Sequence, residues 1–272
     1  MYSKNDILNQ LSEMRAPRDS VVLFHSSLRS IGEIEGGGEG LLDALIEYFT
    51  ADGGLFCVPT HTWGNLGKND RPTLDLTKAE SNLGAFATIA ASDKRGLRTE
   101  NPTHSVVIFG DRERALRLAE KENKITSPTS AESFHGKLFS ERGYVLLAGV
   151  SQNKNTYLHA VDEMLSIPNR MSDDMLTFTV RRANGETVER EMYFYNEDHA
   201  GDVSLRFPKY ETAFRYYHAI KDGFIGDAPA QLCDAEKLFE TVKLIWENSD
   251  GWDPLSDEEP IPPRMYCRKN NK

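Results

Sequence analysis

Cysteine is scarce in this chain of 272 residues, which contains only Cys57, Cys233 and Cys267. These residues are odd in number, lie far apart and lack the close spacing of metal ligands. The sequence therefore indicates neither a disulfide framework nor a zinc site. A reducing cytosol fits this usage best, so we expect a cytoplasmic protein.

Long apolar runs are also missing. The N-terminal segment MYSKNDILNQL has no apolar core of signal-peptide length, and no later stretch is long enough to span a bilayer. Basic residues are outnumbered, at 32 against 42 acidic residues, which gives a formal net charge of -10. Such a charge repels phosphate backbones and favours the approach of small cations. We therefore expect neither a membrane nor a nucleic acid as partner.

What the chain does contain is a series of short apolar runs that end in polar residues. These strand-like runs alternate with helix-like segments over 5–15, 41–49, 83–92 and 111–122, which is typical of an α/β fold. The sequence predicts an α/β/α sandwich with a central, mostly parallel sheet. The predicted strands are 21–24, 55–59, 106–110 and 144–150.

The pattern changes from Met175 onward. Two alternating segments, 176–182 and 187–193, flank Asn184-Gly185 and predict a β-hairpin. Helices are expected over 209–221 and 235–246. We expect a single domain over 1–272, in which about 1–170 form the cofactor and catalytic core and about 171–272 form an added hairpin and helical lobe on the acceptor side.

The densest group of reactive side chains follows the fourth predicted strand. In a helix that begins near Asn155, Asp162 and Glu163 lie three and four positions after His159, so either carboxylate can share its face. A carboxylate that accepts from one ring nitrogen fixes the tautomer and makes the other nitrogen a better base. The alternative interpretation is an ion-paired surface histidine.

Five ordered segments give a more specific indication: HSSLRSIG at 25–32, EGGGEGLLDAL at 35–45, RTENPTHSV at 98–106, SFHGKL at 133–138 and YVLLAGVSQNKNTYLHAVDE at 144–163. With them the chain resembles the aminoglycoside 3-N-acetyltransferase family along nearly its whole length. The resemblance implies acetyl-CoA as donor, no metal, and direct acetyl transfer to the 3-amino group of 2-deoxystreptamine aminoglycosides, which confers antibiotic resistance.

The resemblance also implies roles for particular residues. His159 is the expected general base, and the family's acidic partner, often Glu, maps to Asp162, which leaves the choice between Asp162 and Glu163 open. The loop at 26–32 is expected to hold the pantetheine arm and pyrophosphate, and its amides or the hydroxyl of Ser105 can stabilise the thioester oxyanion. The expected cofactor-binding residues are Ser26, Ser27, Leu28, Arg29, Ser30, Ile31, Gly32, Thr103, Ser105 and Lys137.

For Lys137, a solvent-exposed charge without a ligand is as acceptable an interpretation as contact with a phosphate. A polycationic acceptor needs carboxylates and aromatic side chains around it. The expected substrate-binding residues are His61, Trp63, Asp75, Glu100 and His104. For His104 a structural role is the alternative, and the acidic loop 197–202 is either a cover over the pocket or a solvated loop.

Other functional classes stay open at this stage. A serine or cysteine hydrolase lacks a Gly-x-Ser-x-Gly elbow here, and a metal hydrolase lacks a second histidine at matching spacing. A noncatalytic binding protein and an acetyltransferase for another amine are compatible with the same motifs. A homodimer remains open as the assembly.

Overall fold

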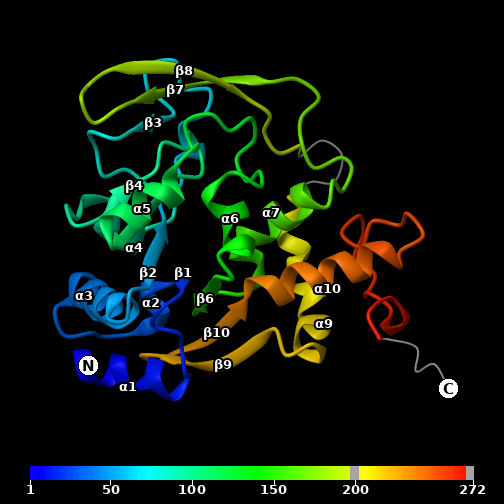
Figure 1. Ribbon diagram of the computed structural model, residues 1–272, viewed down its shortest axis with the longest axis horizontal. Helices are drawn as coiled ribbons and strands as arrows, with labels where there is room; N and C mark the ends of the chain where they lie inside the picture. The colour runs from blue at the N-terminus through cyan, green and yellow to red at the C-terminus, as the bar shows by residue number, and fades with distance from the viewer. Residues whose placement is uncertain (197–201, 268–272) are drawn as a thin grey trace.

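The computed structural model describes residues 1–196 and 202–267, which are built around a seven-stranded sheet with the order β4-β5-β2-β1-β6-β10-β9 (Figure 1). Strand β1 pairs in parallel with β2 and β6, and the other pairings are antiparallel, so five of the seven strands point the same way. The strands are β1 (Val21–Ser26), β2 (Leu55–Pro59), β4 (Leu97–Arg98), β5 (Val106–Gly110), β6 (Tyr144–Ala148), β9 (Ile220–Ile225) and β10 (Ala228–Asp234).

Helices cover both faces of this sheet, which confirms the predicted α/β/α sandwich. Apolar residues of α1, α3 and α4 pack on one face, and those of α5, α6, α7, α9 and α10 pack on the other. The helices are α1 (Lys4–Glu13), α2 (Leu28–Ile31), α3 (Gly37–Thr50), α4 (Ala85–Ser92), α5 (Arg112–Ala119), α6 (Phe134–Ser140), α7 (Tyr157–Met164), α9 (Glu211–Tyr216) and α10 (Ala235–Glu247).

The continuous apolar character of the central strands follows from this double cover. Along β1, Val21 and Leu23 pack into one layer of the core, whereas Val22 and Phe24 pack into the other. Side chains alternate between the two faces of a strand, so a strand that is buried on both faces is apolar at consecutive positions. The sequence pattern therefore revealed the strands but not their direction, and β5 runs antiparallel to β2.

A second, three-stranded sheet with the order β3-β7-β8 stands apart from the first, at the top of Figure 1. Strands β7 (Leu176–Arg181) and β8 (Thr187–Met192) form the predicted hairpin, and β3 (Leu74–Asp75) pairs with β7. Gly185 adopts φ +86° in the turn, and its N–H donates to the Arg182 carbonyl at 2.9 Å. The left-handed conformation explains the need for glycine after Asn184.

The C-terminal third departs from the sequence-based picture of an added lobe. Strands β9 and β10 extend the main sheet, because β10 pairs with β6. The helix expected over 209–221 is present but shorter, because α9 covers Glu211–Tyr216, after a 3₁₀ helix over Val203–Tyr210 and before β9. Helix α10 lies where it was predicted. In the acidic loop 197–202, residues 197–201 lie outside the described residues.

The polar residues after the central strands share one edge of the sheet. Because β2, β1 and β6 are adjacent and parallel, their carboxyl ends meet there, and ligands of α/β sheets bind beyond such ends. In the part of the chain that the structure describes, no helix combines the length and apolar character needed to cross a membrane.

Candidate active site

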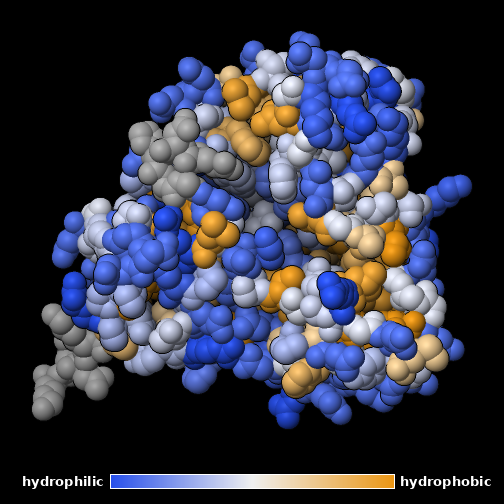
Figure 2. All heavy atoms as spheres, turned by 180° about the vertical axis from the view of Figure 1, so that it is seen from behind, coloured by the Kyte–Doolittle hydropathy of each residue, from blue (hydrophilic) through white to orange (hydrophobic). Residues whose placement is uncertain are grey.

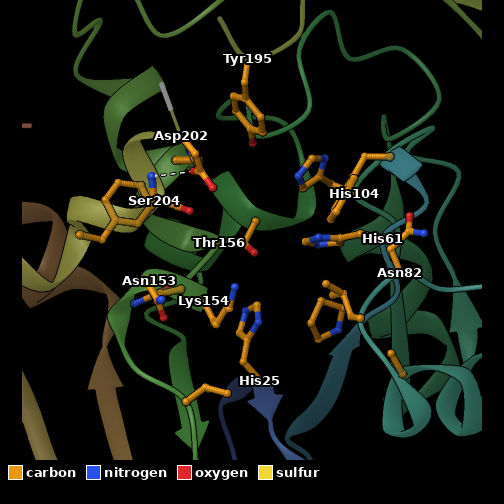
Figure 3. Close-up of a pocket in the computed structure, with 18 of the residues that line it drawn as sticks. His25, His61, Asn82, His104, Asn153, Lys154, Thr156, Tyr195, Asp202 and Ser204 are labelled. Carbon is orange, nitrogen blue, oxygen red and sulfur yellow. Dashed lines mark hydrogen bonds between the residues drawn. The ribbon is translucent and has the colours of Figure 1, made fainter. Parts of the chain in front are cut away.

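A cavity of about 690 Å³ lies beyond the carboxyl ends of β1 and β2, and residues after β6 form a further part of its wall. On the face shown in Figure 2, apolar side chains gather around a central hollow. The polar lining residues come from segments far apart in the sequence (Figure 3). They are His25, Ser26, His61, Asn82, His104, Asn153, Lys154, Asn155, Thr156, His159, Arg170, Tyr195, Asn196, Asp202 and Ser204.

His159 lies on the first turn of α7 and lines this cavity. Its ring stacks on the ring of Tyr195, with centroids 4.3 Å apart and planes inclined by 25°, and it meets Phe207 edge-on at 4.9 Å. Burial lowers the pKa of His159 to about 4, Asp202 opposes this shift and Arg170 adds to it. The imidazole is therefore neutral at physiological pH, the form that can accept a proton.

Neither carboxylate that the sequence offered as a partner bonds to this ring. Asp162 is buried and accepts from Arg170 Nε at 2.7 Å, and the other two nitrogens of Arg170 bind both oxygens of Asp253 at 2.7 and 2.8 Å. Burial raises the pKa of Asp162 to about 6, against the effect of Arg170. This carboxylate anchors α7 to the C-terminal segment.

Glu163 has a different set of partners. Its carboxylate accepts from the hydroxyls of Ser127 and Thr129 and from the Thr129 N–H at 3.0 Å. Burial raises the pKa of Glu163, and these hydrogen bonds oppose the rise. The expected direct carboxylate–imidazole pair is thus absent among the described residues: Asp162 bonds to Arg170 through one oxygen, its Oδ1 has no partner, and Glu163 bonds to Ser127 and Thr129.

Three further histidines form a buried cluster beside the cavity. The ring of His61 lies 4.3 Å from that of His104 and 5.9 Å from that of His135. Nε2 of His61 and both ring nitrogens of His135 have no hydrogen-bond partner, whereas Nδ1 of His104 is 2.9 Å from the Thr103 hydroxyl. Burial lowers the pKa of all three, to about 3 for His135, so the cluster is uncharged.

His25, the penultimate residue of β1, lies at the floor of the cavity (Figure 3). Its Nε2 has no partner, and burial, assisted by Lys154, lowers its pKa to about 3. Lys154 and Thr156 extend toward the same space (Figure 3), and no side-chain hydrogen bond of Thr156 caps α7. The cavity thus offers an ammonium group and a hydroxyl on the side of His25.

The predicted cofactor-binding loop at 26–32 contributes fewer residues to the cavity wall than expected. Ser26 lines the cavity, but the residues after it turn into α2, whose first turn is capped by the hydroxyl of Ser27. Thr103 and Ser105 are fully buried, and the Ser105 hydroxyl bonds to Thr60 and Arg98. Lys137 lies outside the cavity and donates to the carbonyls of Leu118 and Glu120, which explains its position without a phosphate. Outside the lining lie Ser27, Leu28, Arg29, Ser30, Ile31, Gly32, Thr103, Ser105 and Lys137.

The predicted acceptor residues divide into two groups. His61, Trp63 and His104 line the cavity, and Trp63 is 46% exposed at its rim. Asp75 and Glu100 do not line it. Asp75 is buried, accepts from Thr77 and lies 3.5 Å from Arg181.

Glu100 pairs with Arg182 at 3.2 Å. The two acids therefore fix the small sheet, because Arg181 and Arg182 belong to the end of the β7–β8 hairpin. Among the described residues, no group of three or more His, Cys, Asp or Glu is arranged to hold a metal ion.

Sequence reasoning missed several residues of the cavity. Arg170, Tyr195 and Phe207 come from irregular or 3₁₀ segments, which carry no periodic signal. Lys154 and Thr156 lie inside the segment 144–163 but carried no predicted role. A signal was available for these two, because they directly precede the helix that presents His159.

Comparisons with known proteins find a matching family model and several relatives. A family model described as aminoglycoside 3-N-acetyltransferase matches residues 23–246. The SPbeta prophage-derived aminoglycoside N(3')-acetyltransferase-like protein YokD of Bacillus subtilis (strain 168) is 23% identical over 92% of this chain and 94% of its own length. Aminoglycoside N(3)-acetyltransferase VII of Streptomyces paromomycinus is 24% identical over 80% of this chain and 82% of its own length.

Two solved structures share the fold. AAC-IIIb in a binary complex with CoASH superimposes with a TM-score of 0.77 at 18% identity, covering 91% of this chain and 97% of that one. A mutant of aminoglycoside acetyltransferase AAC(3)-IVa in complex with a gentamicin gives a TM-score of 0.76 at 23% identity, covering 98% and 94%.

Proposed function

This chain belongs to the aminoglycoside 3-N-acetyltransferase family, and we propose that it transfers acetyl from acetyl-CoA directly to the 3-amino group of a 2-deoxystreptamine aminoglycoside. In this proposal the reaction takes place in the cytoplasm and confers antibiotic resistance. A relative of the same fold is named as a complex with CoASH and another as a complex with a gentamicin, which supports both substrates.

The observation that carries the proposal is a neutral imidazole that faces a cavity containing also an ammonium group and a carboxylate. His159, Lys154 and Asp202 all line the cavity. Because burial keeps the pKa of His159 near 4, its unprotonated ring nitrogen is available as a base. Lys154 suits a phosphate of the donor, and Asp202 suits a cationic group of the acceptor.

In the proposed reaction the acceptor amine attacks the thioester carbonyl while His159 takes one of its protons. The new N–C bond forms, the C–S bond breaks, and the departing thiolate takes the proton from the imidazolium. The scheme needs neither a covalent enzyme intermediate nor a metal ion. The negative charge that develops on the carbonyl oxygen requires a hydrogen-bond donor close by, and we assign this role to the Thr156 hydroxyl.

One feature of the lining favours a second candidate, an acetyltransferase for an amine with fewer positive charges. Of the described lining residues, Asp202 is the only carboxylate, whereas Lys154 and Arg170 are cations. The acids expected to hold a polycation, Asp75 and Glu100, are engaged with arginines outside the cavity. The electrostatic contribution of such a lining to binding is less favourable for a polyamine than for a monoamine.

The test is a panel of acceptors assayed for release of free CoA thiol, with the acetylated position determined by mass spectrometry and NMR. Apramycin, gentamicin and neomycin represent the aminoglycosides, and simple primary amines represent the second candidate. Turnover with aminoglycosides at the 3-amino group supports the first proposal, and turnover with simple amines alone supports the second. No turnover with any amine would leave a noncatalytic binding protein.

A further inference from the structure

We infer that Tyr195 is a positioning residue for His159, and that its ring is fixed by a chain of hydroxyls ending at Glu163. The inference rests on the proposed function in one respect, the role of His159 as the base. It gives Glu163 an indirect part in the reaction, in place of the direct carboxylate–imidazole hydrogen bond that the sequence suggested.

The first link is between two rings. Tyr195 projects into the cavity from the side of Asp202 and His104 (Figure 3), and its ring stacks on that of His159 with centroids 4.3 Å apart. Phe207 closes a second side of His159 edge-on at 4.9 Å. A ring held between two aromatic surfaces cannot rotate freely, so its nitrogens keep a fixed direction in the cavity.

The second link is a hydrogen bond whose direction the structure determines. The Tyr195 and Thr129 hydroxyl oxygens are 3.0 Å apart, and the Thr129 hydroxyl donates to Glu163. Because a threonine hydroxyl has one hydrogen, its oxygen must accept from Tyr195. Burial raises the pKa of Tyr195 well above its usual value, so this donor proton is retained.

The third link fixes the carboxylate oxygen that belongs to the tether between Glu163 and Tyr195. The N–H and hydroxyl of Thr129 both donate to this oxygen of Glu163, whereas Ser127 donates to the other oxygen, which lies outside the tether. Glu163 belongs to α7, the same helix as His159. The chain from Glu163 through Thr129 to Tyr195 therefore returns to the helix that presents the base, and it closes a loop of contacts around the imidazole.

The hydrogen bonds of Glu163 also provide a matched control. Ser127 and Thr129 both bond to Glu163, but only Thr129 continues to Tyr195. Ser127→Ala removes a hydrogen bond to the carboxylate and leaves the tether to the ring in place. Thr129→Val keeps the N–H contact and the side-chain shape but removes the tether. If Glu163 has only a structural role, Ser127→Ala and Thr129→Val should lower kcat to a similar extent.

The experiment measures kcat and the KM for acetyl-CoA in Ser127→Ala, Thr129→Val, Tyr195→Phe and Tyr195→Leu, together with thermal unfolding. We expect Thr129→Val and Tyr195→Phe to lower kcat about 10-fold and Tyr195→Leu about 100-fold, with KM unchanged, because an imprecisely held base slows only the chemical step. Ser127→Ala is expected to keep kcat within about 2-fold of the unsubstituted enzyme.

A readout independent of turnover separates this inference from the proposed function. The ring nitrogens of His159, observed by NMR, should shift in Tyr195→Leu and Thr129→Val but not in Ser127→Ala, even if no acceptor is found. Equal losses of kcat in Ser127→Ala and Thr129→Val, or unchanged His159 signals in Tyr195→Leu, would overturn the inference.

Discussion

Acidification should destabilise this protein steeply, because its buried histidines cannot accept protons while it is folded. Burial lowers the pKa of five imidazoles, and those with a stated value lie at about 3 or 4. In the unfolded chain a histidine has a pKa of about 6.5. Below that pH the unfolded chain binds protons that the folded protein refuses, so stability is lost as the pH falls. The five residues are His25, His61, His104, His135 and His159.

The magnitude follows from the linkage relation. Between pH 7.5 and 5.5, each such histidine reduces the free energy of unfolding by about 1.4 kcal/mol, and the five together by about 7 kcal/mol. Three buried carboxyls act in the opposite direction, because burial raises the pKa of Glu122 to about 7, that of Asp162 to about 6, and also that of Glu163. Glu122 and Asp162 alone take up protons in the folded state that offset about 2 to 3 kcal/mol over the same interval, and Glu163 adds to this offset. We therefore expect a net loss of at most about 4 kcal/mol.

Urea unfolding at the two pH values, followed by tryptophan fluorescence and circular dichroism, measures this loss. His135→Phe should shrink it by about 1.4 kcal/mol, because the His135 ring is fully buried and neither of its nitrogens has a partner. The matched control is His218→Asn, a change at an exposed residue, which should leave the loss unaltered. A difference below about 1 kcal/mol between the two pH values would refute the reasoning.

The remaining predictions concern the cavity and its anchor. His159→Ala should lower kcat by roughly two to four orders of magnitude and leave the KM for acetyl-CoA nearly unchanged in the thiol-release assay; a near-normal kcat would exclude it as the base. Thr156→Val should lower kcat by about 10- to 100-fold, and a change in KM alone would contradict its role at the oxyanion. Lys154→Ala should raise the KM for acetyl-CoA about 10-fold and weaken its dependence on salt, which steady-state kinetics at two ionic strengths would test. Asp253→Asn should reduce the free energy of unfolding in urea by about 3 kcal/mol, and no change would show that Arg170 is held by Asp162 alone.

Local signals in the sequence were sufficient to predict the strands of the core and the helix that carries His159. The run before residue 150 is apolar because β6 is buried on both faces, and the polar segment that follows must turn at the sheet edge. The placement of His159 in a cavity follows from this order of strand, loop and helix. The hairpin was equally predictable, because Gly185 is required in its turn.

Contacts between distant segments could not be predicted in this way. Spacing shows that Asp162 and His159 can share a helix face, but Arg170, which Asp253 holds on its other side, binds the Asp162 carboxylate from outside the helix. Tyr195 stacks on His159 from a segment without periodicity. Strands β9 and β10 were missed because Gly223 and Pro229 weaken their strand pattern; the pairing of β10 with β6, and of β9 with β10, decides their structure.

The double ion pair of Arg170 has a consequence for synthesis of the protein on the ribosome. Asp253 is translated long after α7, so a nascent chain that already contains every residue of the cavity still lacks one of the two carboxylates that hold Arg170. The ion-pair network that anchors α7 is therefore complete only once Asp253 has emerged. A product of premature termination before Trp252 would retain every residue that lines the cavity but lack this anchor.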